Sequence, residues 1–125
     1  MMKRLVLIGL GLVMGVIASW ADGDAAKGEQ TAKQCLACHS VSDNANKVGP
    51  SLLGITSRKP GTAEGYAYSE PFKAYAATIT AWDDANMDAW LKDPKSVVKG
   101  TKMTFAGLKD DAVRADLIAY LKTKN

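Results

Sequence analysis

Two cysteines and a histidine stand together in the stretch KQCLACHSV and supply the most reactive side chains of the chain. Cys35 and Cys38 are separated by two residues, and His39 follows directly. The 125-residue chain has no other cysteine and no other histidine. Any group that these three residues bind must therefore take its remaining ligands from other residue types or from outside the chain.

Several chemistries use cysteines at this spacing. A disulfide between Cys35 and Cys38 is the ordinary outcome in an oxidising compartment, but it leaves His39 without a role and closes only a tiny loop. A thioredoxin-like redox pair needs a βαβ context, which the neighbouring sequence lacks. A zinc site needs a fourth ligand, and the chain has no second Cys or His pair. The pattern C-x-x-C-H instead favours covalent attachment of haem c through both sulfurs, with His39 as an axial ligand.

Residues 1–21 have the composition of an export signal. Lys3 and Arg4 precede a continuous apolar run over residues 5–18, and small residues follow in SWA at the spacing of a cleavage site. The apolar run is shorter than the roughly 20 residues of a membrane-spanning helix. We therefore predict a signal peptide over 1–21 and a mature domain over 22–125, with an uncleaved N-terminal anchor as the alternative.

Without that segment, the chain is small and nearly neutral. The full sequence has 16 basic and 13 acidic residues, and losing Lys3 and Arg4 leaves a net charge of +1. This charge gives no reason to expect a nucleic-acid partner. A domain of about 100 residues buries only about 60–65% of the surface that its unfolded chain exposes, so a large apolar prosthetic group would complete its core.

Helix-forming residues, capping residues and glycines predict an all-α domain with about four to five helices and long loops. The last helix is the clearest, because Val113, Leu117 and Leu121 recur every four residues after two aspartates. No stretch alternates apolar and polar residues as a strand would. Helices are predicted from near Asp24 into the cysteines and over 70–79, 83–93 and 110–123, with loops over 57–69 and 96–107.

An iron bound by His39 has a sixth coordination position, and its occupant separates an electron carrier from an enzyme. Because the chain has no second histidine, a methionine is the candidate. Outside the predicted signal, Met87 lies in a predicted helix and Met103 lies in the loop KGTKMTFAG. Spacing alone makes Met103 a candidate ligand and leaves core packing as the alternative.

Six stretches, taken in order, make the whole mature chain recognisable. They are GDAAKGE, CLACH, KVGPSLLGI, SRKPGTAEGYAYS, KGTKMTFAGL and RADLIAYLK. In this order they resemble the class I c-type cytochromes, and in particular the group of bacterial cytochrome c2 and mitochondrial cytochrome c. The resemblance implies a class I cytochrome c fold wrapped around one haem c that is attached through Cys35 and Cys38.

The resemblance also implies roles for individual residues. His39 and Met103 would be the axial ligands, and the Pro50 carbonyl would accept the second ring N–H of His39. Phe105 would cover the haem edge, and Trp90 stands where mitochondrial relatives have a tyrosine that hydrogen-bonds the methionine sulfur. Four residues would surround the haem propionates, namely Arg58, Tyr68, Trp82 and Thr101.

Two further departures from the family limit what can be carried over. Ala32 replaces an aromatic residue that many relatives have on the first helix, so the expected contact of Gly28 with Leu117 and Tyr120 would be thinner. The stretch over residues 70–81 is longer than its mitochondrial counterpart, and no role is assigned within it.

A haem with histidine and methionine ligands has no open coordination position, which favours one-electron transfer over catalysis. We expect no enzyme activity but a soluble, monomeric periplasmic carrier between a quinol-oxidising membrane complex and an oxidase, a reaction centre or another reductase. The alternatives are a haem enzyme or gas-binding protein with a labile sixth ligand, and a membrane-anchored electron-transfer module. By resemblance, four lysines would ring the exposed haem edge and dock the partner, unless they merely solvate the surface: Lys47, Lys95, Lys102 and Lys109.

Overall fold

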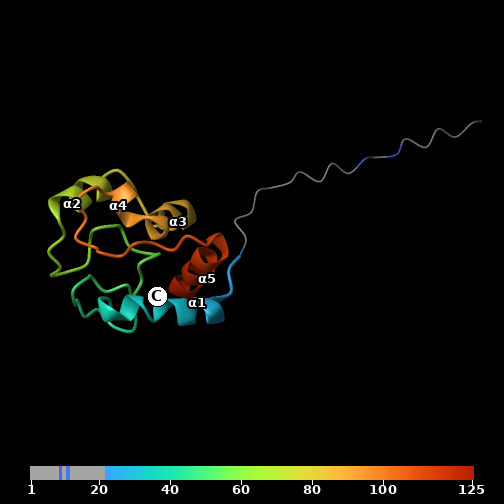
Figure 1. The fold of residues 1–125 in the computed structure, drawn as a ribbon, viewed down its shortest axis with the longest axis horizontal. Coiled ribbons are helices and arrows are strands. Elements are labelled where there is room, and N and C mark those ends of the chain that lie inside the picture. Colours follow the sequence, from blue (N-terminus) through green and yellow to red (C-terminus); the bar gives the residue numbers. More distant parts are fainter. Residues whose placement is uncertain (1–8, 10, 12–21) are drawn as a thin grey trace, which may run out of the picture.

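The computed structural model describes residues 9, 11 and 22–125, in which all regular structure is helical (Figure 1). The predicted signal lies outside the described residues apart from Gly9 and Gly11, so the boundary at residue 21 stays a prediction. None of the described helices is both long enough and apolar enough to cross a bilayer. The elements are α1 (Ala25–Ala32), the 3₁₀ turn η1 (Cys35–Ala37), α2 (Glu70–Ala76), α3 (Asp84–Lys92), α4 (Pro94–Val97) and α5 (Asp111–Lys122).

Side-chain caps fix where the helices begin. The carboxylate of Asp24 accepts hydrogen bonds from the backbone at the start of α1, and Asp110 does the same for α5. Ser69 caps α2 and Asp83 caps α3. Each cap satisfies backbone N–H groups that have no partner within the helix. The predicted helices over 70–79, 83–93 and 110–123 therefore begin close to their predicted first residues, and the all-α prediction is confirmed.

Two local features differ from the prediction. The first helix does not continue into the cysteines: α1 ends at Ala32, and the separate 3₁₀ turn η1 holds Cys35. The stretch after α3 is not purely loop, because Pro94 begins the short helix α4. Proline tolerates the first position of a helix, where its missing N–H would have no partner, and Asp93 caps this helix by accepting from Ser96 N–H at 3.3 Å.

The terminal helices α1 and α5 lie side by side and form the main helix–helix contact (Figure 1). Their closest approach is at Gly28, where an added Cβ would overlap the Asp116 carbonyl oxygen and lie 2.8 Å from Tyr120 Cβ. The Asp24 N–H also donates to the Asp116 carboxylate at 2.7 Å. The absence of a side chain at Gly28 thus lets the two backbones come together beside the fully buried Leu117.

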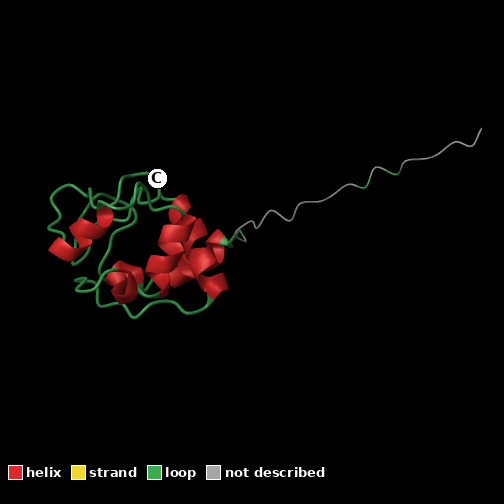
Figure 2. Cartoon of the chain, turned by 90° about the horizontal axis from the view of Figure 1, so that it is seen from above, coloured by secondary structure: helices red, strands yellow, loops and turns green. Residues whose placement is uncertain are grey.

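A buried arginine fastens α5 to the rest of the domain. The side chain of Arg114 is 3% exposed, and its Nε donates to the Asp88 carboxylate of α3 at 2.7 Å. Its guanidinium also donates to the Leu108 carbonyl at 2.8 Å and to the Asp111 carboxylate. These bonds, led by the one to Asp88, raise the pKa of Arg114. The arginine therefore ties α3, α5 and the loop between α4 and α5 into one unit. Loops make up much of the rest of the domain (Figure 2).

We expect Gly28→Ala to destabilise the fold by about 1–3 kcal/mol or more, because the methyl group meets backbone atoms of α5 that cannot move aside. A loss of stability would be informative, because alanine stabilises a helix relative to glycine by about 1 kcal/mol when nothing obstructs its side chain. Guanidinium unfolding measures the change, with Glu29→Ala, an exposed neighbour on α1, as the control. A Gly28→Ala protein as stable as the parent would contradict this close approach.

Candidate functional site

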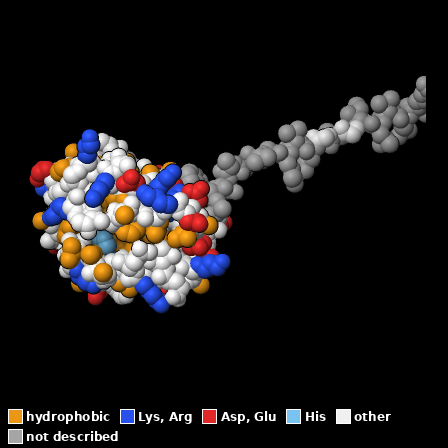
Figure 3. Space-filling view, viewed as in Figure 1, with side chains coloured by type: hydrophobic (Ala, Val, Ile, Leu, Met, Phe, Trp, Pro, Cys, Tyr) orange, Lys and Arg blue, Asp and Glu red, His pale blue; other side chains and the backbone are white. Residues whose placement is uncertain are grey.

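A cavity of about 350 Å³ brings most of the predicted site residues together. Apolar and aromatic side chains dominate its wall, with contributions from η1, α2, α3, α5 and the loops between them. Figure 3 shows the histidine side chain, in pale blue, among hydrophobic side chains at the surface. The predicted residues that line the cavity are Cys35, Cys38, His39, Pro50, Tyr68, Trp82, Trp90, Thr101, Lys102, Met103 and Phe105.

A second hollow of about 470 Å³ is open to solvent and offers less chemistry. It lies over Asp83, Asp84 and Lys122, and an ion pair of 2.7 Å joins Asp84 to Lys122. Its wall contains no thiol, imidazole or thioether. Of these two hollows, the cavity that holds the thiols, the imidazole and the thioethers is therefore the candidate functional site.

The 3₁₀ turn aims both thiols at this cavity. The Cys38 N–H donates to the Cys35 carbonyl at 3.1 Å, which is the i to i+3 hydrogen bond of a 3₁₀ helix. Residues three apart eclipse one another in this geometry, so Cys35 and Cys38 both face the cavity. Both cysteines are free, and burial raises the pKa of Cys35 with a further contribution from Cys38. The turn thus presents two separate thiols rather than a disulfide.

The imidazole of His39 is held in one tautomer. Its Nδ1 lies 2.6 Å from the Pro50 carbonyl, and since a carbonyl can only accept, Nδ1 carries the proton. Burial is the main cause that lowers the pKa of His39, while the bond to Pro50 opposes this shift and the charges of Lys47 and Arg58 assist it. The neutral ring keeps a lone pair on Nε2, which is the form that ligates a metal.

Gly49 provides the surface against which this ring packs. An added Cβ would overlap His39 Cε1 and lie 2.7 Å from Nδ1 and 2.9 Å from Nε2. The Gly49 N–H also donates to the Cys38 carbonyl at 2.8 Å. Only glycine therefore lets the loop carry Pro50 close enough to accept from the ring.

Both candidate methionines reach the cavity, from different environments. Met87 is 4% exposed and belongs to the buried core of α3. Met103 is half-buried in the loop after α4, where its N–H donates to Thr101 Oγ1 at 3.3 Å. Since Met103 is packed less tightly and lies on a loop, its thioether is the freer of the two to act as a ligand.

The polar residues predicted around the propionates divide into two groups. Tyr68 lines the cavity, and its hydroxyl accepts from the Ala63 N–H at 2.9 Å, which leaves the hydroxyl proton to donate. Arg58 lies outside the cavity wall, and its guanidinium donates to the carbonyls of Leu53, at 2.9 Å, and Ser51. A role for Arg58 toward the propionates therefore stays a prediction, whereas its bonds organise the loop beside Pro50.

Two aromatic residues of the cavity wall were missed by sequence reasoning, namely Tyr66 in the loop before α2 and Phe72 on α2. Phe72 on α2 lines the wall beside Tyr68, Trp82 and Trp90. It falls in the stretch to which the family resemblance assigned no role. The spacing of Phe72, Tyr75 and Ala76 is that of one helix face, and this signal could have placed Phe72 against the core.

These residues fit a covalently attached haem. Two free thiols, a neutral imidazole and a thioether face a cavity whose wall is otherwise mainly apolar and aromatic. Such a wall suits a large apolar ring, and the sulfur and nitrogen atoms suit its vinyl groups and its iron.

Comparison with known proteins decides the family. The family model described as Cytochrome c matches residues 25–125. The chain belongs to the cytochrome c family. It is 46% identical to a cytochrome c2 of Blastochloris viridis, over 99% of this chain and 95% of that one. It is 49% identical to a cytochrome c-554 of Methylosinus trichosporium, over 81% of this chain and 75% of that one.

A solved structure gives the same answer for the fold. Cytochrome cH from Methylobacterium extorquens superposes with a TM-score of 0.74 at 47% identity, covering 82% of this chain and all of that one. The class I cytochrome c fold is thus confirmed. As a member of this family, the protein is a c-type electron-transfer cytochrome with one haem c attached through Cys35 and Cys38.

We expect Gly49→Ala to displace the His39 ring or the loop that carries Pro50, because the new methyl group would occupy space that the ring now fills. The haem absorption bands of the purified protein should shift, and the unfolding midpoint in guanidinium should fall. Asn44→Ala is the control, since Asn44 is exposed in the same loop and does not line the cavity. Equal spectra and stability in the two variants would refute this packing of His39 on Gly49.

Proposed function

We propose that the protein is a periplasmic carrier that exchanges single electrons with membrane redox complexes, with His39 and Met103 as the axial ligands of its haem iron. The observation that carries the proposal is the pairing of a neutral His39, whose Nε2 is free, with a loop-borne Met103 thioether on the wall of one cavity. Haem bound there supplies the one-electron exchange between ferrous and ferric iron.

The two side chains favour transfer over catalysis. With His39 and Met103 as ligands, no coordination position remains for a substrate or a gas, and methionine raises the reduction potential. The hydrogen bond from His39 to Pro50 keeps the imidazole oriented. A haem enzyme or gas-binding protein would need Met103 to be absent or easily displaced, and a membrane-anchored module would need residues 1–21 to be retained.

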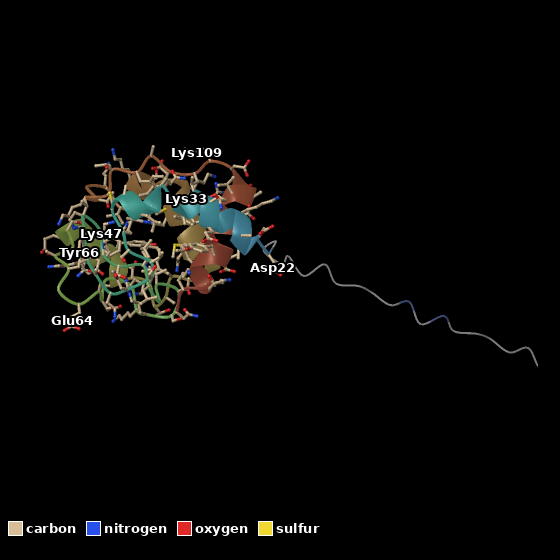
Figure 4. All side chains as sticks on the ribbon, turned by 90° about the horizontal axis from the view of Figure 1, so that it is seen from below. Asp22, Lys33, Lys47, Glu64, Tyr66 and Lys109 are labelled. Carbon is tan, nitrogen blue, oxygen red and sulfur yellow. The ribbon has the colours of Figure 1, made fainter. Side chains whose placement is uncertain are left out.

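Local charge near the cavity supports a docking role for the lysines. Lys102 lines the cavity, and Lys47 and Lys109 are exposed on loops beside elements that line it (Figure 4). Each ammonium donates to a backbone carbonyl: Lys47 to Leu36 at 2.7 Å, Lys102 to Ala67 at 2.8 Å and Lys109 to Lys92 at 2.8 Å. Lys95 lies exposed on α4, outside this set of hydrogen bonds.

Apolar surface accompanies these charges. Val48, beside Lys47, is 75% exposed and also lines the cavity, and Leu36, whose carbonyl binds Lys47, is 37% exposed. A small apolar centre with lysines at its rim suits a weak interface with an acidic partner surface, from which release is fast. The donor would be a quinol-oxidising complex, and the acceptor an oxidase, a reaction centre or another reductase.

The axial role of Met103 is tested with a matched pair of variants that exchange sulfur for carbon, Met103→Leu and Met87→Leu. Met103→Leu should abolish the long-wavelength methionine–iron band of the oxidised protein and let exogenous cyanide or imidazole bind. It should also lower the potential by more than about 59 mV, a tenfold change in a one-electron equilibrium. Met87→Leu should leave all three properties close to the parent. The reverse pattern would assign the ligand to Met87, and no effect from either would favour the enzyme or gas-binding alternative.

The docking role is tested by the salt dependence of electron transfer. We expect the second-order rate with the physiological partner to fall as salt rises, with most screening reached by about 0.1 M, where the Debye length is about 10 Å. Lys95→Glu should slow the reaction about tenfold at low salt without changing stability, since its ammonium holds no loop in place. Lys27→Glu on α1 changes the net charge equally at a lysine outside the predicted docking set. Equal rates for both variants would mean that Lys95 only solvates the surface.

A further inference from the structure

We infer that Phe72 is a haem-contacting residue that closes the cavity to water and thereby raises the reduction potential. The inference rests on the cavity being the haem site. It assigns a role to α2, in the stretch that is longer than its mitochondrial counterpart and for which the family resemblance implies nothing.

The start of α2 fixes where Phe72 points. Ser69 caps the helix, and its Oγ accepts from the Phe72 N–H at 3.2 Å. Pro71 restricts the backbone directly before Phe72. The position of the aromatic ring is therefore set by a capped first turn and not by a freely moving loop.

Phe72 packs against three of the four predicted aromatic residues that line the cavity. Its ring stacks on Tyr68, with centroids 5.3 Å apart and planes 14° apart, and it meets Trp90 edge-on at 5.5 Å and 75°. Its centroid lies 6.3 Å from that of Trp82. Such pairs are stabilising beyond their buried area. Removing the Phe72 ring would thus deprive all three neighbours of a partner on the cavity side.

Comparison with Tyr75 shows that Phe72 differs from its aromatic neighbour on α2 by its place on the cavity wall, and not by aromatic packing. Tyr75 lies on the same helix and packs against the same tryptophans. Its ring centroid is 6.0 Å from that of Trp82 and 6.4 Å from that of Trp90. Unlike Phe72, it does not line the cavity. The two residues therefore form a natural pair in which one faces the cofactor and the other only packs behind it.

Helix α2 also connects two loops that border the cavity. An added Cβ on Gly61 would lie 3.1 Å from Ala76 Cβ and 3.8 Å from the Phe72 ring, and one on Gly100 would lie 3.4 Å from Pro71 Cγ. The helix thus sits between the loop that carries Tyr68 and the loop that leads to Met103. Phe72 fills the space on the cavity side of this junction, where its loss would admit water.

Water near the iron favours the ferric state, which carries one more positive charge than the ferrous state, because a higher dielectric stabilises charge. An apolar ring at position 72 therefore raises the potential. Phe72→Ala should lower it, whereas Tyr75→Ala should destabilise the fold without exposing the cavity.

The experiment compares Phe72→Ala with Tyr75→Ala, and Phe72→Leu with Tyr75→Leu, in the haem-loaded protein. Haem content, reduction potential and the guanidinium unfolding midpoint are measured for each. Phe72→Ala should shift the ferric-to-ferrous ratio at a fixed potential at least threefold toward ferric, and Phe72→Leu should shift it less in the same direction. Both Tyr75 variants should keep the parent's ratio, whatever their loss of stability. If Phe72→Ala fails to fold, the two leucine variants give the comparison.

Two results would overturn the inference. Equal potentials in the Phe72 variants and the parent would show that Phe72 only packs, and an equal shift in the Tyr75 variants would show that the effect is a general loosening of the aromatic cluster. Failure of the carrier proposal is separate, since it shows in the parent as missing covalent haem or as a missing methionine–iron band.

Discussion

The close contact between the first and last helices is the constraint on which the site depends. Because Gly28 has no side chain, the backbones of α1 and α5 meet at Asp116. The end of α1 then leads directly into the turn that carries the thiols, and α5 supplies Leu117 and Leu121 to the cavity wall. One helix pair thus positions both the covalent attachment points and part of the apolar surface on which the cofactor rests.

Loops carry most of the remaining site, and side chains hold them by bonding to backbone carbonyls. His39 binds the Pro50 carbonyl, Arg58 binds that of Leu53, and Lys102 binds that of Ala67. A loop exposes carbonyls that no helix or sheet satisfies, so each such bond both meets that need and fixes the loop. Ligands on loops can therefore be held in place by a domain that has only short helices.

The extent to which sequence predicts this structure follows from whether each signal is local. Caps at Asp24 and Asp110 and the spacing of the two cysteines depend on neighbouring residues only, and they lead to the helix starts and to haem attachment. The break between Ala32 and Cys35 has no such signal, because Lys33 and Gln34 favour a helix, and helix propensity alone misses it. The short helix α4 does have a local signal in Asp93 and Pro94, which was overlooked beside the glycines of the loop that follows. Phe72 was missed for another reason, because no role was carried over to a stretch that is longer than its mitochondrial counterpart, although the helical periodicity there is informative.

An exposed lysine can stabilise a loop and, at the same time, attract a partner through its charge. A bond from Lys47 or Lys109 to a backbone carbonyl stabilises a loop, yet the ammonium stays exposed and its charge remains felt over about a Debye length. A partner carboxylate that binds such a lysine directly must compete with the carbonyl already bound, which limits the strength of the contact. This competition does not weaken the long-range electrostatic attraction of the partner, since that attraction depends on the charge of the lysine and not on a free hydrogen-bond donor. The arrangement therefore favours fast encounter and weak binding together, which is the combination that the proposed carrier role needs.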